Sequence, residues 1–227
     1  MSKTDQDLLL YAGHRQRLRQ KFMDDKLTGY EILELLLSYA IPRKDVRPLS
    51  RLLYKQFGNP HSILAAPIEE LLKVPGLGQN TAVFIKAIAT LMVESYRSEM
   101  KQTTIFTSKE ALTNYCKIMI GGKPVEEMHV LYLDNAKRLL LDHVHSIGAS
   151  DWTAVHPDEI TRLALLLRAK SIVMIHNHPT PYTSFSNQDI EITTQIKNIL
   201  NQLDIEIYDH YVISGDILYS MRESYCL

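Results

Sequence analysis

The chain has few cysteines and no long apolar run. Its 227 residues include two cysteines, Cys116 and Cys226, which are too few for a disulfide framework and lack the CxxC spacing of a zinc ribbon. The longest apolar stretches, such as residues 163–167, are much shorter than the roughly 20 residues that span a bilayer. The first residues are too acidic and too polar for a signal peptide. We therefore expect a cytoplasmic protein with no membrane partner.

The chain also lacks a strong charge of either sign, although its charges are unevenly distributed. The net charge is −1, and the 45% hydrophobic and 22% charged residues are ordinary for globular proteins, which excludes disordered and fibrous classes. Residues 1–60 carry an excess of 4 basic side chains, and residues 101–227 carry an excess of 4 acidic ones. The length suits two domains, and the asymmetry indicates two units with different partners.

The first 97 residues have helical periodicity and no strand signal. Helices are expected at residues 15–25, 30–39, 46–57, 68–74 and 79–97. The polar residues 98–108 then predict a linker between an all-α domain over residues 1–100 and a second domain over residues 101–227.

From residue 126 the apolar pattern changes to that of strands. Strands are expected at residues 129–134, 139–147, 171–175, 205–214 and 217–221, and helices at residues 108–119, 156–169 and 187–203. The continuous apolar run at 171–175 is typical of a strand buried in a sheet. The sequence therefore predicts an α+β protein, with an all-α domain followed by a mixed α/β domain.

A pair of histidines follows the most apolar strand, in the segment His176-Asn-His178-Pro. Two histidines at i and i+2 project to the same side of a strand, and a carboxylate from the next helix, Asp189, can join them. Two histidines and an aspartate leave a fourth position for water, as in catalytic zinc sites. The alternatives are histidines that bond nearby carbonyls, and a capping box in which Ser186 and Asp189 are N-cap and N3; capping and metal binding are compatible.

A second pair with the same spacing, His143 and His145, lies in the second expected strand. It has neither a proline after it nor a Ser-x-x-Asp segment. We interpret these two as ordinary strand histidines that contribute nothing to metal binding, because the spacing of two histidines is weak evidence by itself.

The complete pattern of His-x-His-Pro, six residues and Ser-x-x-Asp resembles the motif of the JAMM (MPN/JAB) metalloproteases. The His-Asn-His-Pro form, the Val155-His156-Pro157 turn and the Asp209-His210 pair resemble the RadC branch of that family, and the resemblance covers residues from about 103 to the end. It implies a JAB/MPN fold, which is cytidine-deaminase-like, and a hydrolase of peptide or isopeptide bonds. The implied substrate is a peptide or an isopeptide-linked protein.

The resemblance also implies roles for individual residues. His176, His178 and Asp189 would bind one zinc ion. Glu126 would act as general base on the attacking water and pass the proton to the leaving amine, with Glu127 as the alternative. Ser186 would donate a hydrogen bond to the oxyanion of the tetrahedral intermediate. Without the resemblance, two adjacent glutamates before a strand indicate only a solvated loop.

The sequence departs from the RadC-like pattern at two places. The loop between His-Pro and the serine usually reads Ser-Gly-Asp-Pro-x-Pro, whereas residues 180–185 here read Thr-Pro-Tyr-Thr-Ser-Phe. The length is kept and the glycine is lost, so the resemblance does not carry over the shape of this loop. In the turn before the helix, Asp158 replaces the usual arginine. Every expected metal ligand is present.

A second motif, Val-Pro-Gly76-Leu-Gly78, connects two expected helices and resembles the helix-hairpin-helix of DNA-binding proteins. The region up to about residue 97, with Gly-His-Arg-x-Arg-Leu at 13–18, resembles the N-terminal domain of RadC-like proteins. A Gly-x-Gly turn lets backbone N–H groups meet a phosphate, which predicts weak, sequence-independent DNA binding. The alternative is a tight turn that needs glycine for its backbone angles, and Lys73 and Lys86 are the basic residues close by. The alternative function that these resemblances imply is a nucleic-acid-binding module linked to DNA repair, with a structural zinc or a vestigial site.

Overall fold

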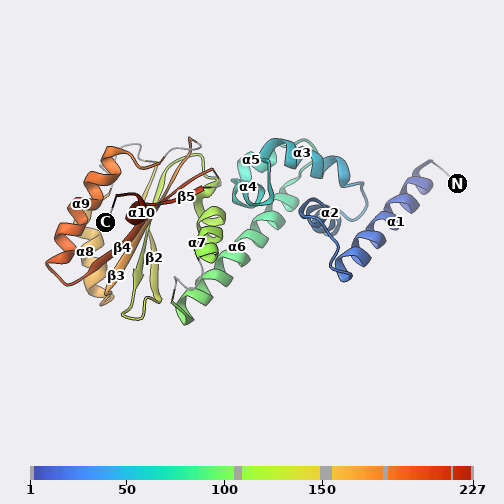
Figure 1. The fold of residues 1–227 in the computed structure, drawn as a ribbon. Helices are drawn as coiled ribbons and strands as arrows, with labels where there is room; N and C mark the ends of the chain where they lie inside the picture. Colours follow the sequence, from blue (N-terminus) through green and yellow to red (C-terminus); the bar gives the residue numbers. More distant parts are fainter. Residues whose placement is uncertain (1–2, 105–108, 149–154, 181–183, 216, 226–227) are drawn as a thin grey trace. The chain divides into compact units, whose positions relative to one another are not determined.

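A computed structural model describes residues 3–104, 109–148, 155–180, 184–215 and 217–225 (Figure 1). Cys226 and the expected helix start at Ser108 lie outside these residues. The chain divides into two compact units, Met1–Ala89 and Thr90–Leu227. Among the described helices, none combines the length and the apolar character that crossing a bilayer requires.

The first unit is helical, as the sequence predicted. It contains α1 (Lys3–Met23), α2 (Gly29–Ala40), α3 (Arg47–Phe57), α4 (Pro60–Ala65), α5 (Ile68–Leu72) and the start of α6 (Gln79–Gln102). Leu37, Leu53 and Leu71 come from three different helices and are fully buried in one core. Burial of such side chains stabilises the fold by about 1.5–3 kcal/mol each, so the helices are held by packing more than by propensity.

Helix α4 was not expected, because its residues lie between the expected helices at 46–57 and 68–74, where Gly58-Asn59-Pro60 indicates a break. In the structure Asn59 is an N-cap whose side chain accepts the Ser62 N–H at 2.9 Å, and Pro60 occupies the first helical position. Proline fits there because its missing N–H has no partner in the first turn. The same residues therefore end one helix and begin the next.

The expected linker was wrong over its first residues. Helix α6 continues to Gln102, and the Thr103 N–H still bonds to the Glu99 carbonyl at 2.9 Å. The segment is polar but contains no helix-breaking residue, and Met100 is buried. Residues 105–108 of the expected linker lie outside the described part of the chain.

The second unit contains a five-stranded sheet in the order β2-β1-β3-β4-β5. The strands are β1 (Glu127–Leu133), β2 (Leu139–Ile147), β3 (Ser171–His178), β4 (Glu206–Ser214) and β5 (Ile217–Ser220). The β3–β4 pair is parallel, and the other pairs are antiparallel. The sheet is therefore mixed, and the predicted α+β class is confirmed.

Helices cover both faces of this sheet (Figure 1). They are α7 (Lys109–Cys116), the π-helical turn η1 (Lys117–Gly121), α8 (Pro157–Leu166), α9 (Asn187–Asn201) and α10 (Met221–Tyr225). Met128, Val130 and Tyr132 of β1 share a core with the apolar sides of α8 and α9. Residues of β1 with the same parity therefore face α8 and α9, and those of opposite parity face the other side.

Helix α10 begins where the sequence predicted that the last strand continues. Ser220 accepts the Glu223 N–H at 3.1 Å and donates to Asp209 Oδ2 at 2.6 Å. This side chain satisfies an N–H group of the first helical turn while it is fixed by a carboxylate from β4. A contact between distant residues thus starts the helix.

Candidate metal centre

The two histidines of the His-Asn-His segment are the last residues of one face of β3. His176 lies opposite Met128 of β1, so it is on the side of the sheet that α8 and α9 cover. Strand alternation places His178 on the same side, at the end of the strand. The His176 side chain is 1% exposed, whereas that of His178 is 12% exposed. One histidine of the pair is therefore buried, and the other lies partly exposed at the protein surface.

Asp189 completes a cluster of three potential metal ligands with this pair. The two histidine Nε2 atoms are 3.0 Å apart, His176 Nε2 is 3.1 Å from Asp189 Oδ1, and His178 Nε2 is 3.6 Å from Asp189 Oδ2. Ligands about 2.0–2.1 Å from a tetrahedral zinc are roughly 3.3–3.4 Å from one another. Two ring nitrogens that face each other at such a distance need a proton or a cation between them. The residues present therefore fit a zinc ion.

The carboxylate of Asp189 is divided between two tasks. Ser186 is the N-cap of α9 and Asp189 is N3, and the two form the expected capping box, which is confirmed. Asp189 Oδ2 accepts hydrogen bonds from the Ser186 N–H at 2.5 Å and from its hydroxyl at 2.7 Å. Within the described residues, Oδ1 is buried and accepts no hydrogen bond of good geometry. One oxygen thus holds the helix start, and the other is directed at the histidines.

The local electrostatics keep this carboxylate charged. Burial raises the pKa of Asp189, but His176 and the hydrogen bonds from Ser186 outweigh it and hold the pKa well below its usual range. Burial lowers the pKa of His176, and the neighbouring His178 adds to that effect, while Asp189 opposes it. A charged carboxylate beside a neutral imidazole is the protonation state that a metal ligand set requires.

A chain of hydrogen bonds orients the His176 ring from behind. The Thr193 hydroxyl donates to the Asp189 carbonyl at 2.5 Å, so its oxygen accepts a hydrogen from His210 Nδ1 at 2.7 Å. His210 Nε2 then accepts the Nδ1–H of His176 at 2.8 Å. Each step leaves one consistent proton position, and the result is that the lone pair of His176 Nε2 faces the other ligands. This is the supporting arrangement found behind metal-bound histidines.

The sequence predicted only part of this support. Asp209-His210 was noted for its resemblance, and no role was given to Thr193. His210 lies beside Met174 in the parallel β3–β4 pair, so its contact with His176 depends on strand pairing across 34 residues. Thr193 comes four residues after Asp189 on the same helix, and this spacing is the one local signal that it faces the site.

Glu126 and Glu127 point to opposite sides of the sheet. The Glu127 N–H donates to Asn177 Oδ1 at 2.8 Å, and its carboxylate contacts Lys123 and lies 3.5 Å from His129 Nε2. Glu126 is half-buried just before β1. Burial raises its pKa; the nearby His178 partly offsets this rise, and the Asp189 charge adds to it. Of the two, Glu126 is the one whose carboxylate is influenced by the histidine–aspartate cluster.

The altered loop contributes an aromatic ring beneath the site. Phe185 is 9% exposed, and its ring packs edge-on against His210 at a centroid distance of 5.4 Å and against His176 at 6.4 Å. It occupies the position of the second proline in the usual loop pattern. Residues 181–183 lie outside the described part of the chain. The described end of the loop thus packs against the two histidines.

The other histidine pair is also part of a cluster. His143, His145 and Glu159 bring their ligand atoms within 4.8 Å of one another, and all three side chains are half-buried. The sequence interpretation of ordinary strand histidines did not anticipate the carboxylate, because Glu159 comes from the first turn of α8.

The Gly-x-Gly turn connects α5 and α6. Gly76 has a φ of +87°, which favours glycine, whereas Gly78 has no such angle. The Gly78 carbonyl accepts the N–H groups of Thr81 and Ala82, both at 3.0 Å, so it starts helix α6. Lys73 pairs with Glu70 at 2.5 Å. The tight-turn interpretation therefore accounts for Gly76.

Comparisons with known proteins place the cluster within a matched region. The model of the RadC-like JAB domain family matches residues 106–226. The chain is 34% identical over 212 residues to UPF0758 protein SPO0054 of Ruegeria pomeroyi, covering 92% of this chain and 95% of that protein. It is also 34% identical over 221 residues to UPF0758 protein FN0909 of Fusobacterium nucleatum, covering 93% and 95% respectively.

Proposed function

Because this chain belongs to the family of RadC-like JAB-domain proteins, we propose that it is a zinc-dependent hydrolase of peptide or isopeptide bonds. The family has a metalloprotease-type fold, is generally hydrolytic and typically binds zinc. The observation that carries the proposal is the convergence of His176 Nε2, His178 Nε2 and Asp189 Oδ1, the last of which is buried without a good hydrogen bond within the described residues.

Zinc held by these three side chains would lower the pKa of water to about 7 and polarise the carbonyl of the substrate. Glu126 serves as the base that takes the proton from the attacking water and gives it to the leaving amine. Its raised pKa suits both steps, because a carboxylate that is too acidic holds a proton poorly. The half-exposed position before β1 lets the group meet a substrate from the surface.

Ser186 can contribute to the reaction in two ways, by stabilising the oxyanion or by positioning Asp189. As the resemblance implies, its hydroxyl can donate to the oxyanion of the intermediate. In the free protein that hydroxyl donates to Asp189 Oδ2 at 2.7 Å, so oxyanion stabilisation requires it to rotate away. Its hydrogen bonds to Asp189 already give it a positioning role, because they fix the carboxylate beside His176.

A catalytic rather than structural metal is favoured by the ligand set. Structural zinc sites have four protein ligands, usually with cysteine, whereas three ligands leave a position for water. The cluster at His176 contains three such residues within the described part of the chain. Cys116 lies on α7, on the other side of the sheet, and burial raises the pKa of its thiol, so it stays protonated.

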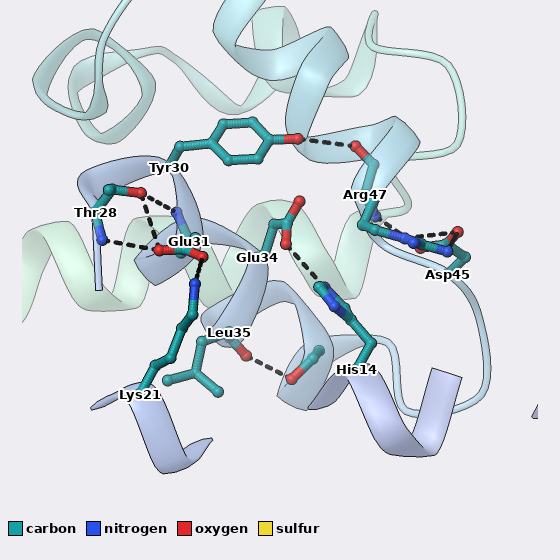
Figure 2. Close-up of polar contacts among 10 residues, drawn as sticks. His14, Lys21, Thr28, Tyr30, Glu31, Glu34, Leu35, Asp45 and Arg47 are labelled. Atoms are coloured by element: carbon teal, nitrogen blue, oxygen red, sulfur yellow. Dashed lines mark hydrogen bonds and ion pairs between the residues drawn. The ribbon is translucent and has the colours of Figure 1, made fainter. Parts of the chain in front are cut away.

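The nucleic-acid reading has weaker support. Figure 2 shows two basic side chains of the first unit that are already paired: Lys21 with Glu31 at 2.5 Å and Arg47 with Asp45 at 2.7 Å. Near the Gly-x-Gly turn, Lys86 donates to the carbonyl of Leu64 at 2.7 Å. Phosphate binding depends on available cations, so these contacts reduce the basic charge that the turn can present. Weak DNA binding through Gly76 and Gly78 remains a secondary proposal.

The hydrolase is tested with the full-length protein in zinc-buffered solution. Purified wild type and His176→Ala/His178→Ala are compared for bound zinc and for cleavage of a peptide library that includes isopeptide-linked substrates. We expect the double variant to lose one zinc per chain and all zinc-dependent cleavage. A double variant that cleaves as fast as the wild type would disprove the proposal.

The secondary proposal is tested by titrating the protein with duplex DNA. Binding at about 50 mM salt that is lost at high salt would support it.

A further inference from the structure

The cluster of His143, His145 and Glu159 repeats the plan of the first site. In both cases a strand carries two histidines at i and i+2, and the next helix in the described part of the chain supplies a carboxylate at its N3 position. Asp189 is N3 of α9, and Glu159 is N3 of α8, which begins at Pro157 after the N-cap His156. Both carboxylates approach from helices on the same side of the sheet, since α8 and α9 share one core.

The strand β2 is shaped so that both histidines reach this side. His143 lies opposite Val130 of β1, which faces α8. His129 pairs with Val144 and Met128 with Ser146, so His145 is an extra residue in the ladder. Such bulges re-aim side chains. The two imidazoles consequently lie edge to face, with centroids 4.8 Å apart.

In the described part of the chain, the hydrogen bonds at His145 leave one buried nitrogen without a partner. Its Nε2 lies 2.7 Å from the hydroxyl of Tyr132, a fully buried side chain. Within the described residues its Nδ1 is buried and has no hydrogen-bond partner. When Nε2–H donates to the Tyr132 oxygen, Nδ1 carries a bare lone pair. A metal-bound histidine has this form, with one nitrogen on the metal and the other N–H donated to a fixed oxygen.

Simpler explanations account for only part of the arrangement. A glutamate in the first turn of α8 is stabilised by the helix dipole, which explains the position of Glu159 without any ligand. That explanation leaves the buried Nδ1 of His145 without a partner among the described residues, and an unpaired buried polar atom costs about 1–3 kcal/mol.

We propose that His143, His145 and Glu159 form a second site for a divalent transition-metal ion, with zinc as the ion that suits two imidazoles and one carboxylate. The ligand atoms lie within 4.8 Å of one another, so small side-chain rotations bring them to the roughly 3.3 Å spacing of tetrahedral ligands. The ion fastens β2, the edge strand in the described sheet order, to α8.

The experiment counts zinc ions per chain in the full-length protein after dialysis against buffered zinc. The variants are His143→Ala/His145→Ala, His176→Ala/His178→Ala and the combination of all four, each checked for folding by circular dichroism. We expect two ions in the wild type, one in each double variant and none in the combination. One ion in the wild type that persists in His143→Ala/His145→Ala would overturn the proposal.

A further variant separates a built site from loose chelation by two neighbouring histidines. Glu159→Gln keeps the size of the side chain and the helix start, and it removes the charged oxygen ligand. We expect at least a tenfold weaker affinity for the second zinc, with the first unchanged. Equal affinity in Glu159→Gln and wild type would show that the ion is adventitious and that the site is not the one proposed. Crystals measured at the zinc absorption edge should show anomalous density beside His145 Nδ1, and density only at His176 would contradict the proposal.

Discussion

Two histidine pairs with the same spacing lie on the same face of one sheet, and they differ in their surroundings. His176 belongs to a strand with neighbours on both sides, whereas His143 belongs to the edge strand β2. The carboxylate that joins the first pair is fixed by a capping box, whereas within the described residues the side chain of the α8 N-cap makes no capping hydrogen bond. The spacing of the histidines therefore conveys little about a site. What distinguishes the pairs is how firmly the third ligand and the rings are held.

The supporting hydrogen bonds differ in the same way. Behind His176, two further side chains fix the ring through three consecutive hydrogen bonds. Behind His145, one buried tyrosine does so. A ligand with more fixed partners loses less freedom when a metal binds, so we expect tighter binding at His176 than at His145.

The strongest test of the comparison concerns the general base. Glu126 lies at the first pair, where His178 and Asp189 influence the pKa of its carboxyl group. Glu126→Gln keeps the shape and removes the base, so hydrolysis should fall by about 10²–10⁴-fold while both zinc ions remain. The measurement is turnover of a cleaved peptide together with zinc content.

Glu127→Gln is the matched control for that change. The Glu127 carboxylate contacts Lys123 and His129, on the other side of the sheet, so turnover per folded molecule should stay unchanged. If the Glu127 variant loses activity and the Glu126 variant keeps it, the assignment of the base is wrong by one residue.

The second prediction concerns the hydrogen-bond partners behind one histidine of each site, which are removed one site at a time. Thr193→Val breaks the chain behind His176, and Tyr132→Phe removes the oxygen beside His145. Loss of such partners typically weakens metal affinity by about 10–100-fold. Each variant should weaken only its own zinc in a competition titration with a chelator. A variant that weakens both sites equally would show that the two ions are coupled or that the fold has loosened.

These experiments address contacts that the sequence could not specify. The proposed ligands His176, His178 and Asp189 were predicted from the resemblance to the JAMM motif, and the strand and the helix start that carry them are visible in the local pattern. His210 and Thr193 meet His176 only after β3 and β4 have paired. The resemblance favoured Glu126 over Glu127, but the surroundings of the two carboxylates follow from the pairing of β1 with β3. Local periodicity contains no information on either pairing.

The helices and strands can be compared in the same way: some follow from the local sequence pattern, and others depend on contacts with distant residues. Long elements such as α2, α9 and β3 were predicted because their apolar residues repeat with a clear period. Helix α10 was missed, because its start depends on a hydrogen bond from Ser220 to Asp209 on another strand. Helix α4 was missed for a different reason, since Asn59 and Pro60 are common both in turns and at helix starts.

The third prediction compares the two helix starts. Ser186→Ala removes a side chain that accepts the Asp189 N–H, so the free energy of unfolding should fall by about 1 kcal/mol. His156→Ala, at the corresponding position of α8, should cost much less, because the side chain of this N-cap makes no capping bond. Urea unfolding of both variants in the presence of chelator measures the difference. Equal losses would mean that the capping box contributes nothing to the contrast between the sites.

The smallest expected effect is on the pH dependence of stability. It concerns His129, a histidine outside the two pairs, on the opposite side of the β1–β2 hairpin. Burial lowers the pKa of His129, but the carboxylates of Asp142 and Glu127 outweigh it, so the pKa is raised overall. A histidine whose folded pKa lies above the unfolded value of about 6.5 contributes stability that is complete below that pH and is lost as the pH rises through the folded pKa. The midpoint of urea unfolding should therefore decrease from pH 6 upward more steeply in the wild type than in His129→Gln.

His145, in the same hairpin, should change stability with pH in the opposite direction, because its pKa is lowered and not raised. Its folded pKa of about 4 lies below the unfolded value, so its contribution is present above about pH 6.5 and is lost as the pH falls towards 4. His145→Gln should therefore flatten the acidic side of the stability profile, whereas His129→Gln flattens the alkaline side. If zinc binds at His145 as proposed, zinc in the buffer should steepen the acidic side further in the wild type and leave His145→Gln unaffected, because protons compete with the ion for the same lone pair.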